Sequence, residues 1–142
     1  MTNKEYLRQA YRLDQKINSD IAEVARLREM ASSISAPVLG DKVQTSRNAD
    51  APFVRSVEKI LLLEEAINRE IDTLVDLKSQ MREVIAAVPN TDERMVLRYR
   101  YIHNLTWEQI GEKLSADKST VRRWHGSALA HVVLPDNPIR IL

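Results

Sequence analysis

Apolar residues recur at intervals of three or four along two long stretches of the chain, residues 3–33 and 53–88. Such intervals place side chains on one face of an α-helix, so each stretch predicts a long amphipathic helix. The first stripe consists of Tyr6, Ala10, Leu13, Ile17, Ile21, Val24, Leu27 and Ala31. The second consists of Val57, Ile60, Leu63, Ile67, Ile71, Leu74, Leu77, Met81, Val84 and Val88.

Neither predicted helix can bury its apolar stripe alone. The simplest arrangement packs the two helices antiparallel, as a coiled-coil-like hairpin over residues 1–88. A second arrangement is intermolecular, with the stripes forming a homodimer or binding another partner. The pattern leaves both arrangements open.

The segment between the two stripes, residues 34–52, differs from its neighbours in composition. It contains two prolines, one glycine and many small polar residues, which argues against regular structure. We therefore expect a flexible linker. Lys42 and Arg47 are candidate phosphate contacts within it, although a solvated connector is the simpler interpretation.

Shorter helices are predicted after Pro89, which interrupts the second long helix. Thr91, followed by acidic residues, is the expected cap of a helix that ends near Ile102. The expected fold is therefore all-α: a long helical hairpin, followed by a three-helix domain over residues 89–134. Further prolines leave residues 135–142 as a loose tail.

The last two helices of this domain have recognisable starts. Thr106 with Gln109 three residues later is the signature of a capping box, at the start of a helix over residues 107–114. A tight turn then leads to a helix over residues 118–132. Asp117 is placed to cap this final helix through its carboxylate.

These two helices have the residue spacing of a helix-turn-helix unit. Such a unit needs apolar residues where two short helices cross and one small residue where their backbones meet. Gly111 supplies the small residue, and Ser115 occupies the turn position where a glycine would be usual. Counted from Trp107 as the first position, the apolar set is Ile110, Leu114, Ala116, Val121 and Trp124. An ordinary packing unit without a ligand remains the alternative.

The final helix offers polar and basic residues at its N-terminal end, on the side away from the apolar set. Such a helix can enter the major groove of DNA with its N-terminal residues at base edges. Arg122 and Arg123 are the strongest candidates for guanine or phosphate contacts, because a guanidinium group fits both. The expected DNA-binding residues are Lys118, Ser119, Thr120, Arg122 and Arg123, with Thr106 and Trp107 at the DNA backbone.

The net charge of +1 conceals an uneven distribution. Residues 113–131 contain four lysine and arginine residues and a single acidic residue, Asp117, so positive charge is concentrated around the final helix. No apolar run approaches the ~20 residues that span a bilayer, and the polar N-terminal segment lacks the apolar centre of a signal peptide. We therefore expect no membrane contact and a cytoplasmic location.

The chain shows no sign of catalytic or metal chemistry. It has no cysteine, which excludes disulfides, iron–sulfur clusters and thiolate zinc sites, and it has no P-loop, GxGxxG or GxSxG motif. His125 and His131 are six residues apart and do not share a helix face as ligands four apart would. We expect no enzyme activity, no cofactor and no metal, with the histidines at the surface or facing phosphates.

The segment ERMVLRYRYIHNLTWEQIGEKLSADKSTVRRWHGSAL, residues 93–129, resembles region 4 of bacterial sigma factors. The whole chain, with two long helices and a DKVQTS stretch between them, resembles the ArpU/RinA-like phage regulators of late transcription. The resemblance implies a transcription activator that binds promoter or operator DNA and contacts RNA polymerase. It places the DNA contacts on Lys118, Ser119, Thr120, Arg122 and Arg123. No counterpart of sigma region 2 is visible, so promoter melting as an independent sigma factor is not implied.

The leading hypothesis is a sequence-specific regulator of phage or prophage transcription that binds double-stranded DNA at the bacterial nucleoid. Two alternatives remain open. One is a DNA-packaging factor, such as a small terminase-like subunit, or a recombination accessory factor. The other is a helical protein-interaction module that does not bind DNA.

Overall fold

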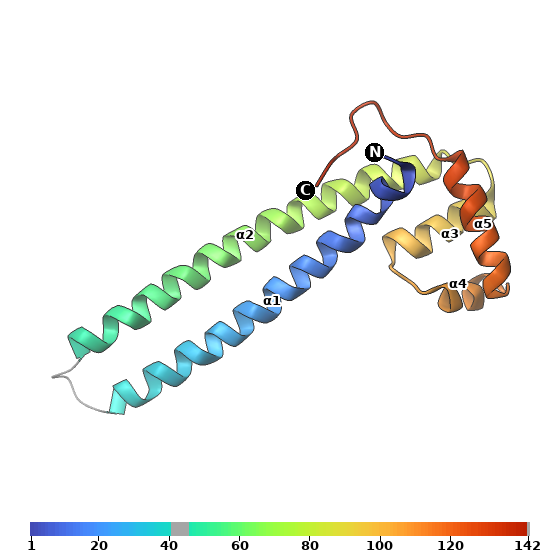
Figure 1. Ribbon diagram of the computed structural model, residues 1–142. Helices are drawn as coiled ribbons and strands as arrows, with labels where there is room; N and C mark the ends of the chain where they lie inside the picture. The colour runs from blue at the N-terminus through green and yellow to red at the C-terminus, as the bar shows by residue number, and fades with distance from the viewer. Residues whose placement is uncertain (41–45, 142) are drawn as a thin grey trace. The chain divides into compact units, whose positions relative to one another are not determined.

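The computed structural model describes residues 1–40 and 46–141, with the side chains of residues 34–40 and 46–52 outside the description. The fold is all-α, as predicted, and these ranges contain no strand. The helical elements are α1 (Asn3–Gly40), α2 (Ser46–Ala86), α3 (Thr91–Leu97), the π-helical turn η2 (Arg98–Ile102), α4 (Trp107–Leu114) and α5 (Lys118–His131), as Figure 1 shows.

The two long helices extend further than the sequence pattern predicted. α1 continues to Gly40 and α2 begins at Ser46, so the predicted linker over residues 34–52 is wrong at both of its ends. Once a long helix exists, each added residue gains a backbone hydrogen bond without a new nucleation step. A proline removes one such hydrogen bond, and Pro37 and Pro52 lie within the two helices without ending them. The residues between the two helices, and the side chains of Lys42 and Arg47, lie outside the described part of the chain.

The chain groups into two compact units, which differ from the predicted division after residue 88. We call residues 1–14 and 73–142 the terminal unit, and residues 15–72 the hairpin unit. The first turns of α1 and the last turns of α2 belong to the terminal unit because they share a core with the C-terminal helices. That core consists of Tyr6, Leu7, Ala10, Leu77, Met81, Val84, Ile85, Val88, Leu97, Tyr101, Ile102, Ala128 and Val132.

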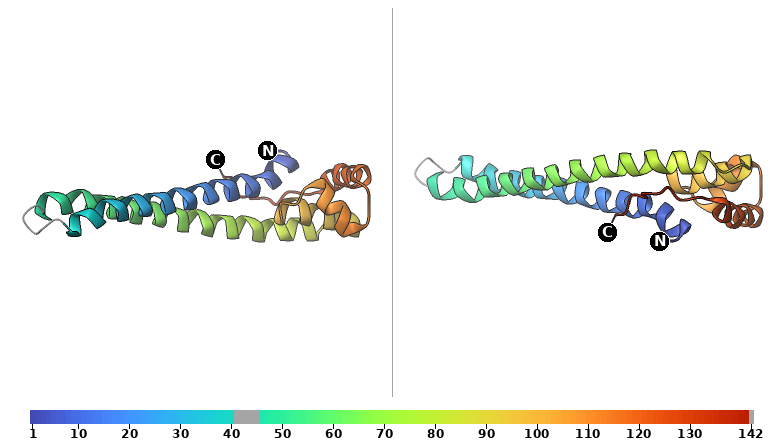
Figure 2. Two further views of the ribbon diagram at one scale, coloured as in Figure 1. Left: turned by 90° about the horizontal axis from the view of Figure 1, so that it is seen from below. Right: turned by 90° about the horizontal axis from the view of Figure 1, so that it is seen from above.

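In the hairpin unit α1 and α2 lie antiparallel and side by side, in all three views of Figure 1 and Figure 2. The buried members of the predicted stripes in this unit are Ile17, Val24, Ala31, Ile60 and Ile67. Ion pairs between the helices join Lys16 to Glu70, with 2.9 Å between Nζ and Oε1, and Arg28 to Glu64. Two stripe residues, Ile21 and Ile71, are exposed instead of buried.

The C-terminal tail is irregular, as predicted, but side-chain amides of the long helices hold it. Gln9 donates to the carbonyl of Ile139 (2.9 Å) and accepts from the N–H of Ile141 (2.7 Å). Gln80 accepts from the N–H of Ile139 (2.9 Å). The described part of the tail is therefore tied to the terminal unit, in contrast to the loose segment that the sequence suggested.

α3 begins at a cap that differs from the predicted one. The Asn90 side chain accepts a hydrogen bond from the N–H of Glu93 (3.1 Å), so Asn90 and not Thr91 is the N-cap. Asparagine is also the stronger capping residue of the two. After α3 the backbone widens into η2, where the N–H of His103 donates to the carbonyl of Arg98 in the five-residue step of a π-helix.

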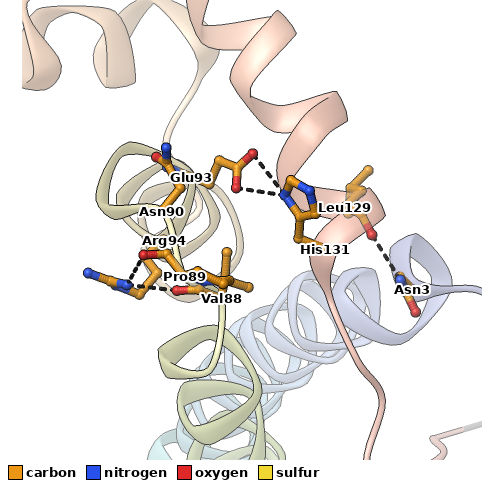
Figure 3. A network of polar contacts seen from close by, with 8 residues as sticks. All are labelled: Asn3, Val88, Pro89, Asn90, Glu93, Arg94, Leu129 and His131. Atoms are coloured by element: carbon orange, nitrogen blue, oxygen red, sulfur yellow. Dashed lines mark hydrogen bonds and ion pairs between the residues drawn. The ribbon is translucent and has the colours of Figure 1, made fainter.

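Polar contacts tie α3 to the end of α5 and to the neighbouring chain segments, as Figure 3 shows. The buried Glu93 carboxylate meets Nδ1 of His131 at 2.9 Å, which joins α3 to the last turn of α5. Arg94 donates to the carbonyls just beyond the end of α2. Asn3 donates to the carbonyl of Leu129 at 2.8 Å, so the start of α1 is held against α5.

The turn between α4 and α5 depends on a close backbone approach at Gly111. A Cβ atom at this position would lie 2.6 Å from the carbonyl oxygen of Ala116. The N–H groups of Ser115 and Ala116 both donate to the Gly111 carbonyl, which closes the turn. Ser115 has φ 54° and ψ 46°, the left-handed conformation that a glycine adopts without strain.

Replacing the two glycines of α4 and α5 by alanine should have opposite effects. Gly111→Ala should lower the free energy of unfolding by about 1–3 kcal/mol, because its methyl group clashes with a backbone carbonyl that cannot rotate away. Gly126→Ala is the matched control: nothing lies within 4 Å of a Cβ there, and alanine should stabilise the helix by about 0.5–1 kcal/mol. Urea denaturation measures both, and a Gly111→Ala variant as stable as the wild type would contradict the close approach.

Candidate nucleic-acid interface

A small apolar core holds α4 and α5 together. Its fully buried members are Val96, Ile110 and Val121, one from each of α3, α4 and α5. The partly buried residues around them are Tyr99, Leu105, Trp107, Leu114, Ala116 and Trp124. All five apolar residues of the predicted spacing belong to this cluster, so the predicted packing is confirmed.

Asp117 starts α5 as the sequence predicted. Its carboxylate accepts a hydrogen bond from the backbone N–H of Thr120 at 2.7 Å. The hydrogen bonds with Thr120 lower the pKa of the Asp117 carboxyl, and the nearby positive charge of Arg123 lowers it further. Asp117 is therefore ionised near neutral pH and satisfies a donor at the first turn of α5.

The basic residues of α5 point away from the apolar core. Lys118, Ser119, Arg122 and Arg123 are all exposed, whereas Val121 between them is fully buried. Lys118 forms a long, exposed ion pair with Glu108, with 3.6 Å between the charged atoms. Neither arginine forms an ion pair with any described residue. The two guanidinium groups are therefore available to an external anion or hydrogen-bond acceptor.

The other three predicted DNA-binding residues also have structural tasks. The Thr106 hydroxyl accepts from the N–H of Gln109 (3.2 Å), and the Gln109 side chain accepts from the N–H of Thr106 (2.9 Å), so the predicted capping box is confirmed. Trp107 is half-buried and packs against the small core. Thr120 is half-buried and gives its N–H to Asp117. Of the three, only Thr106 is exposed.

A cluster of cationic and aromatic side chains that sequence reasoning missed lies around Trp107. The Arg100 guanidinium carbon lies 4.3 Å from the centre of the Trp107 ring, and this side chain donates to the carbonyl of Leu105 (3.0 Å). His125 meets the same ring edge-on, with 4.7 Å between ring centres, and its Nε2 lies 2.6 Å from the Tyr101 hydroxyl. The cluster joins η2, α4 and α5.

The expectation that the histidines lie at the surface or face phosphates holds for His103 and His131, which are exposed, but is wrong for His125. His125 is buried, because its ring fills the space between Trp107 and Tyr101. Burial lowers the pKa of His125 to about 4, with further lowering by the positive charges of Lys4 and Arg100. His125 is therefore a neutral structural residue near pH 7.

Basic residues on the first turns of α1 form a second feature of the terminal unit. Lys4, Arg8 and Arg12 recur every four residues and are all exposed, so they form one stripe on α1. That spacing was readable from the sequence, but nothing there placed the stripe beside the C-terminal helices. Tyr6 and Leu7 are both fully buried in the core of the terminal unit, and their packing places the basic stripe of α1 beside the C-terminal helices.

Neither a metal centre nor a membrane span appears in the described ranges. These residues include no group of three or more histidine, aspartate or glutamate side chains arranged to hold a metal ion. They also include no helix that combines the length and apolar character needed to cross a bilayer.

The protein is therefore an all-α protein with a small apolar core. One face of α5 packs on this core, and the basic residues at the start of α5 are exposed to solvent. Residues 9–132 match the family described as "Protein of unknown function (DUF722)". The chain belongs to this family. No curated protein and no solved structure matches the chain.

His125 should make the protein less stable as the pH falls below neutral. An unfolded histidine takes up a proton near pH 6.5, whereas folded His125 does so only near pH 4, so protons bind preferentially to the unfolded chain in this window. The free energy of unfolding should therefore decrease by on the order of 2–3 kcal/mol from this group between pH 7 and pH 4.

Urea denaturation of the wild type and His125→Gln at several pH values isolates this contribution, because glutamine keeps hydrogen-bonding capacity but does not titrate. The difference in unfolding free energy between the two proteins should shrink as the pH falls. Parallel pH profiles would contradict a buried neutral histidine.

Proposed function

We propose that the chain is a sequence-specific DNA-binding transcription regulator whose α4 and α5 act as a helix-turn-helix unit. The observation that carries the proposal is the pair of exposed guanidinium groups at Arg122 and Arg123, on a short helix whose opposite face is buried. Lys118 and Ser119 extend this surface towards the start of α5. The proposal assigns the reading of base edges to this part of α5.

The chemistry of these side chains suits the major groove. An α-helix fits into the groove, and an arginine fork can bind O6 and N7 of guanine or a phosphate oxygen. The rigid turn at Gly111 and Ser115 supports the proposal, since a recognition helix must be held at a constant position relative to its neighbour. Thr106, exposed at the start of α4, is assigned to the DNA backbone.

The resemblance to phage regulators and to region 4 of sigma factors extends the proposal to a late-gene activator that contacts RNA polymerase. A homodimer formed through the long helices would present two copies of α5 to two half-sites. The exposed stripe residues Ile21 and Ile71 supply apolar surface for such a contact. Sedimentation of the full chain with and without DNA tests the dimer, and footprinting with added polymerase tests the protein partner.

Arg122→Ala and Arg123→Ala should each weaken binding to a duplex selected from a random pool. An arginine that reads a base should lose about 1–3 kcal/mol on the selected duplex and less on a scrambled one, because the lost contact is sequence-specific. An arginine that binds phosphate should weaken both duplexes alike and reduce the slope of log affinity against log salt by about one. Fluorescence anisotropy over a salt series measures both effects.

Arg55→Ala is the matched control, because it removes the same charge from an exposed position on α2 in the hairpin unit. It should leave affinity and salt slope unchanged. If neither α5 variant differs from this control, α5 is not the reading helix.

If the wild type binds no duplex at low salt, the protein-interaction module becomes the better hypothesis. A closed ring of many subunits on DNA would favour a packaging factor instead of a transcription regulator.

A further inference from the structure

The terminal unit contains a cavity of about 520 Å³ that the proposed reading helix does not use. Its walls come from the first turns of α1, from η2 and the loop after it, from the start of α4, and from His125 of α5. The volume lies within the range of about 300–1,000 Å³ that is usual for small-molecule sites, so it has room for a phosphate group with an attached sugar.

Positive charge converges on this cavity from separate segments. Lys4 and Arg8 enter from α1, and Arg100 enters from η2. None of the described lining residues is acidic, and none of the three cations forms an ion pair with a described residue. A smaller hollow of about 250 Å³ shares Lys4 and Arg8 with it and is also lined by Arg12, Thr2 and Glu5, so three cations and one carboxylate of α1 continue along the same surface.

These cations do not serve the stability of α1. Like charges four residues apart repel each other and destabilise a helix, and Lys4, Arg8 and Arg12 form two such pairs in succession. Further along α1, Lys16 is neutralised by Asp20 and Glu70, with 2.9 Å to each carboxylate oxygen. The stripe near the cavity has no such partners among the described residues, and a bound anion would relieve the repulsion.

The remaining groups of the cavity are arranged to receive an anion. Arg100 is held in place by the carbonyl of Leu105 and by the face of Trp107, so little side-chain entropy would be lost when it binds. Thr106 lies at the start of α4, where the helix dipole favours negative charge, although the capping box already uses the N–H groups of Thr106 and Gln109. The buried ring of His125, which is neutral near pH 7, forms part of the wall and adds no charge.

We infer that this cavity is a phosphate site, which receives a sugar–phosphate group of the DNA backbone beside the groove that α5 reads. This inference rests on the proposed function, and it makes Lys4 and Arg8 part of the DNA-binding surface. It also extends the interface beyond the residues of α4 and α5, to two residues of α1 about 100 positions earlier in the chain. The ligand chemistry is a phosphate ester, whose other conceivable source is a free nucleotide.

The double variant Lys4→Ala/Arg8→Ala tests the inference in the full chain. It should bind the selected and the scrambled duplex about tenfold more weakly at moderate salt, because lost phosphate contacts carry no sequence information. The slope of log affinity against log salt should fall by about one to two. The charge-keeping variant Lys4→Arg/Arg8→Lys should remain close to the wild type on both measures.

The matched control is Arg55→Ala/Lys59→Ala, which removes two exposed charges four residues apart from α2 in the hairpin unit. If the wild type binds duplex and the Lys4→Ala/Arg8→Ala variant behaves like this control, the inference is overturned while the proposed function stands. If that variant loses only sequence discrimination, the phosphate assignment is wrong.

A second arm uses deoxyadenosine monophosphate as the free nucleotide, with tryptophan fluorescence as the signal, because Trp107 lines the cavity. Nucleotide binding that depends on Lys4 and Arg8, combined with unchanged duplex affinity, would overturn the DNA backbone as the source of the phosphate. Weak or absent nucleotide binding together with weakened duplex binding supports it, because a single phosphate contact contributes little outside the larger interface.

Discussion

The backbone contact between Gly111 and Ala116 is the constraint on which the candidate interface depends. It brings the end of α4 so close to the start of α5 that no side chain fits between them. Ser115 accepts a left-handed conformation to complete the turn, and Asp117 then caps α5. With the turn closed in this way, Val121 lies in the apolar core, and the neighbouring arginines must face solvent. A short helix thus gains a defined orientation from a few local contacts.

The core of the terminal unit joins distant parts of the sequence. Tyr6 and Leu7 of α1 are fully buried together with residues from the end of α2 and from the C-terminal helices. Asn3 and Gln9 add hydrogen bonds to α5 and to the tail. The first turns of α1 are therefore part of the same compact unit as α4 and α5, and this packing places Lys4 and Arg8 around the same cavity as Arg100 of η2.

Sequence reasoning succeeded where the determining interactions are local. Apolar periodicity predicted both long helices, and the capping box at Thr106 predicted the start of α4 to the residue, because each depends on neighbours within a turn or two. It failed at the π-turn η2, at the burial of His125 and at the basic stripe of α1. These features depend on partners far along the chain, such as Lys4 beside His125, which no local pattern records. At the predicted linker, the local proline and glycine pattern indicated irregular structure, whereas both long helices extend into this segment.

The central claim is that the basic face of α5 meets duplex DNA, and backbone amide shifts measured by NMR test it most directly. An isotope-labelled full chain is titrated with a short duplex at low salt, and the perturbed amides are mapped on the structure. We expect the largest shifts at residues 106–107 and 118–123, with residues 53–72 of the hairpin unit unaffected. Shifts confined to the hairpin unit, or none at any DNA concentration, would contradict it.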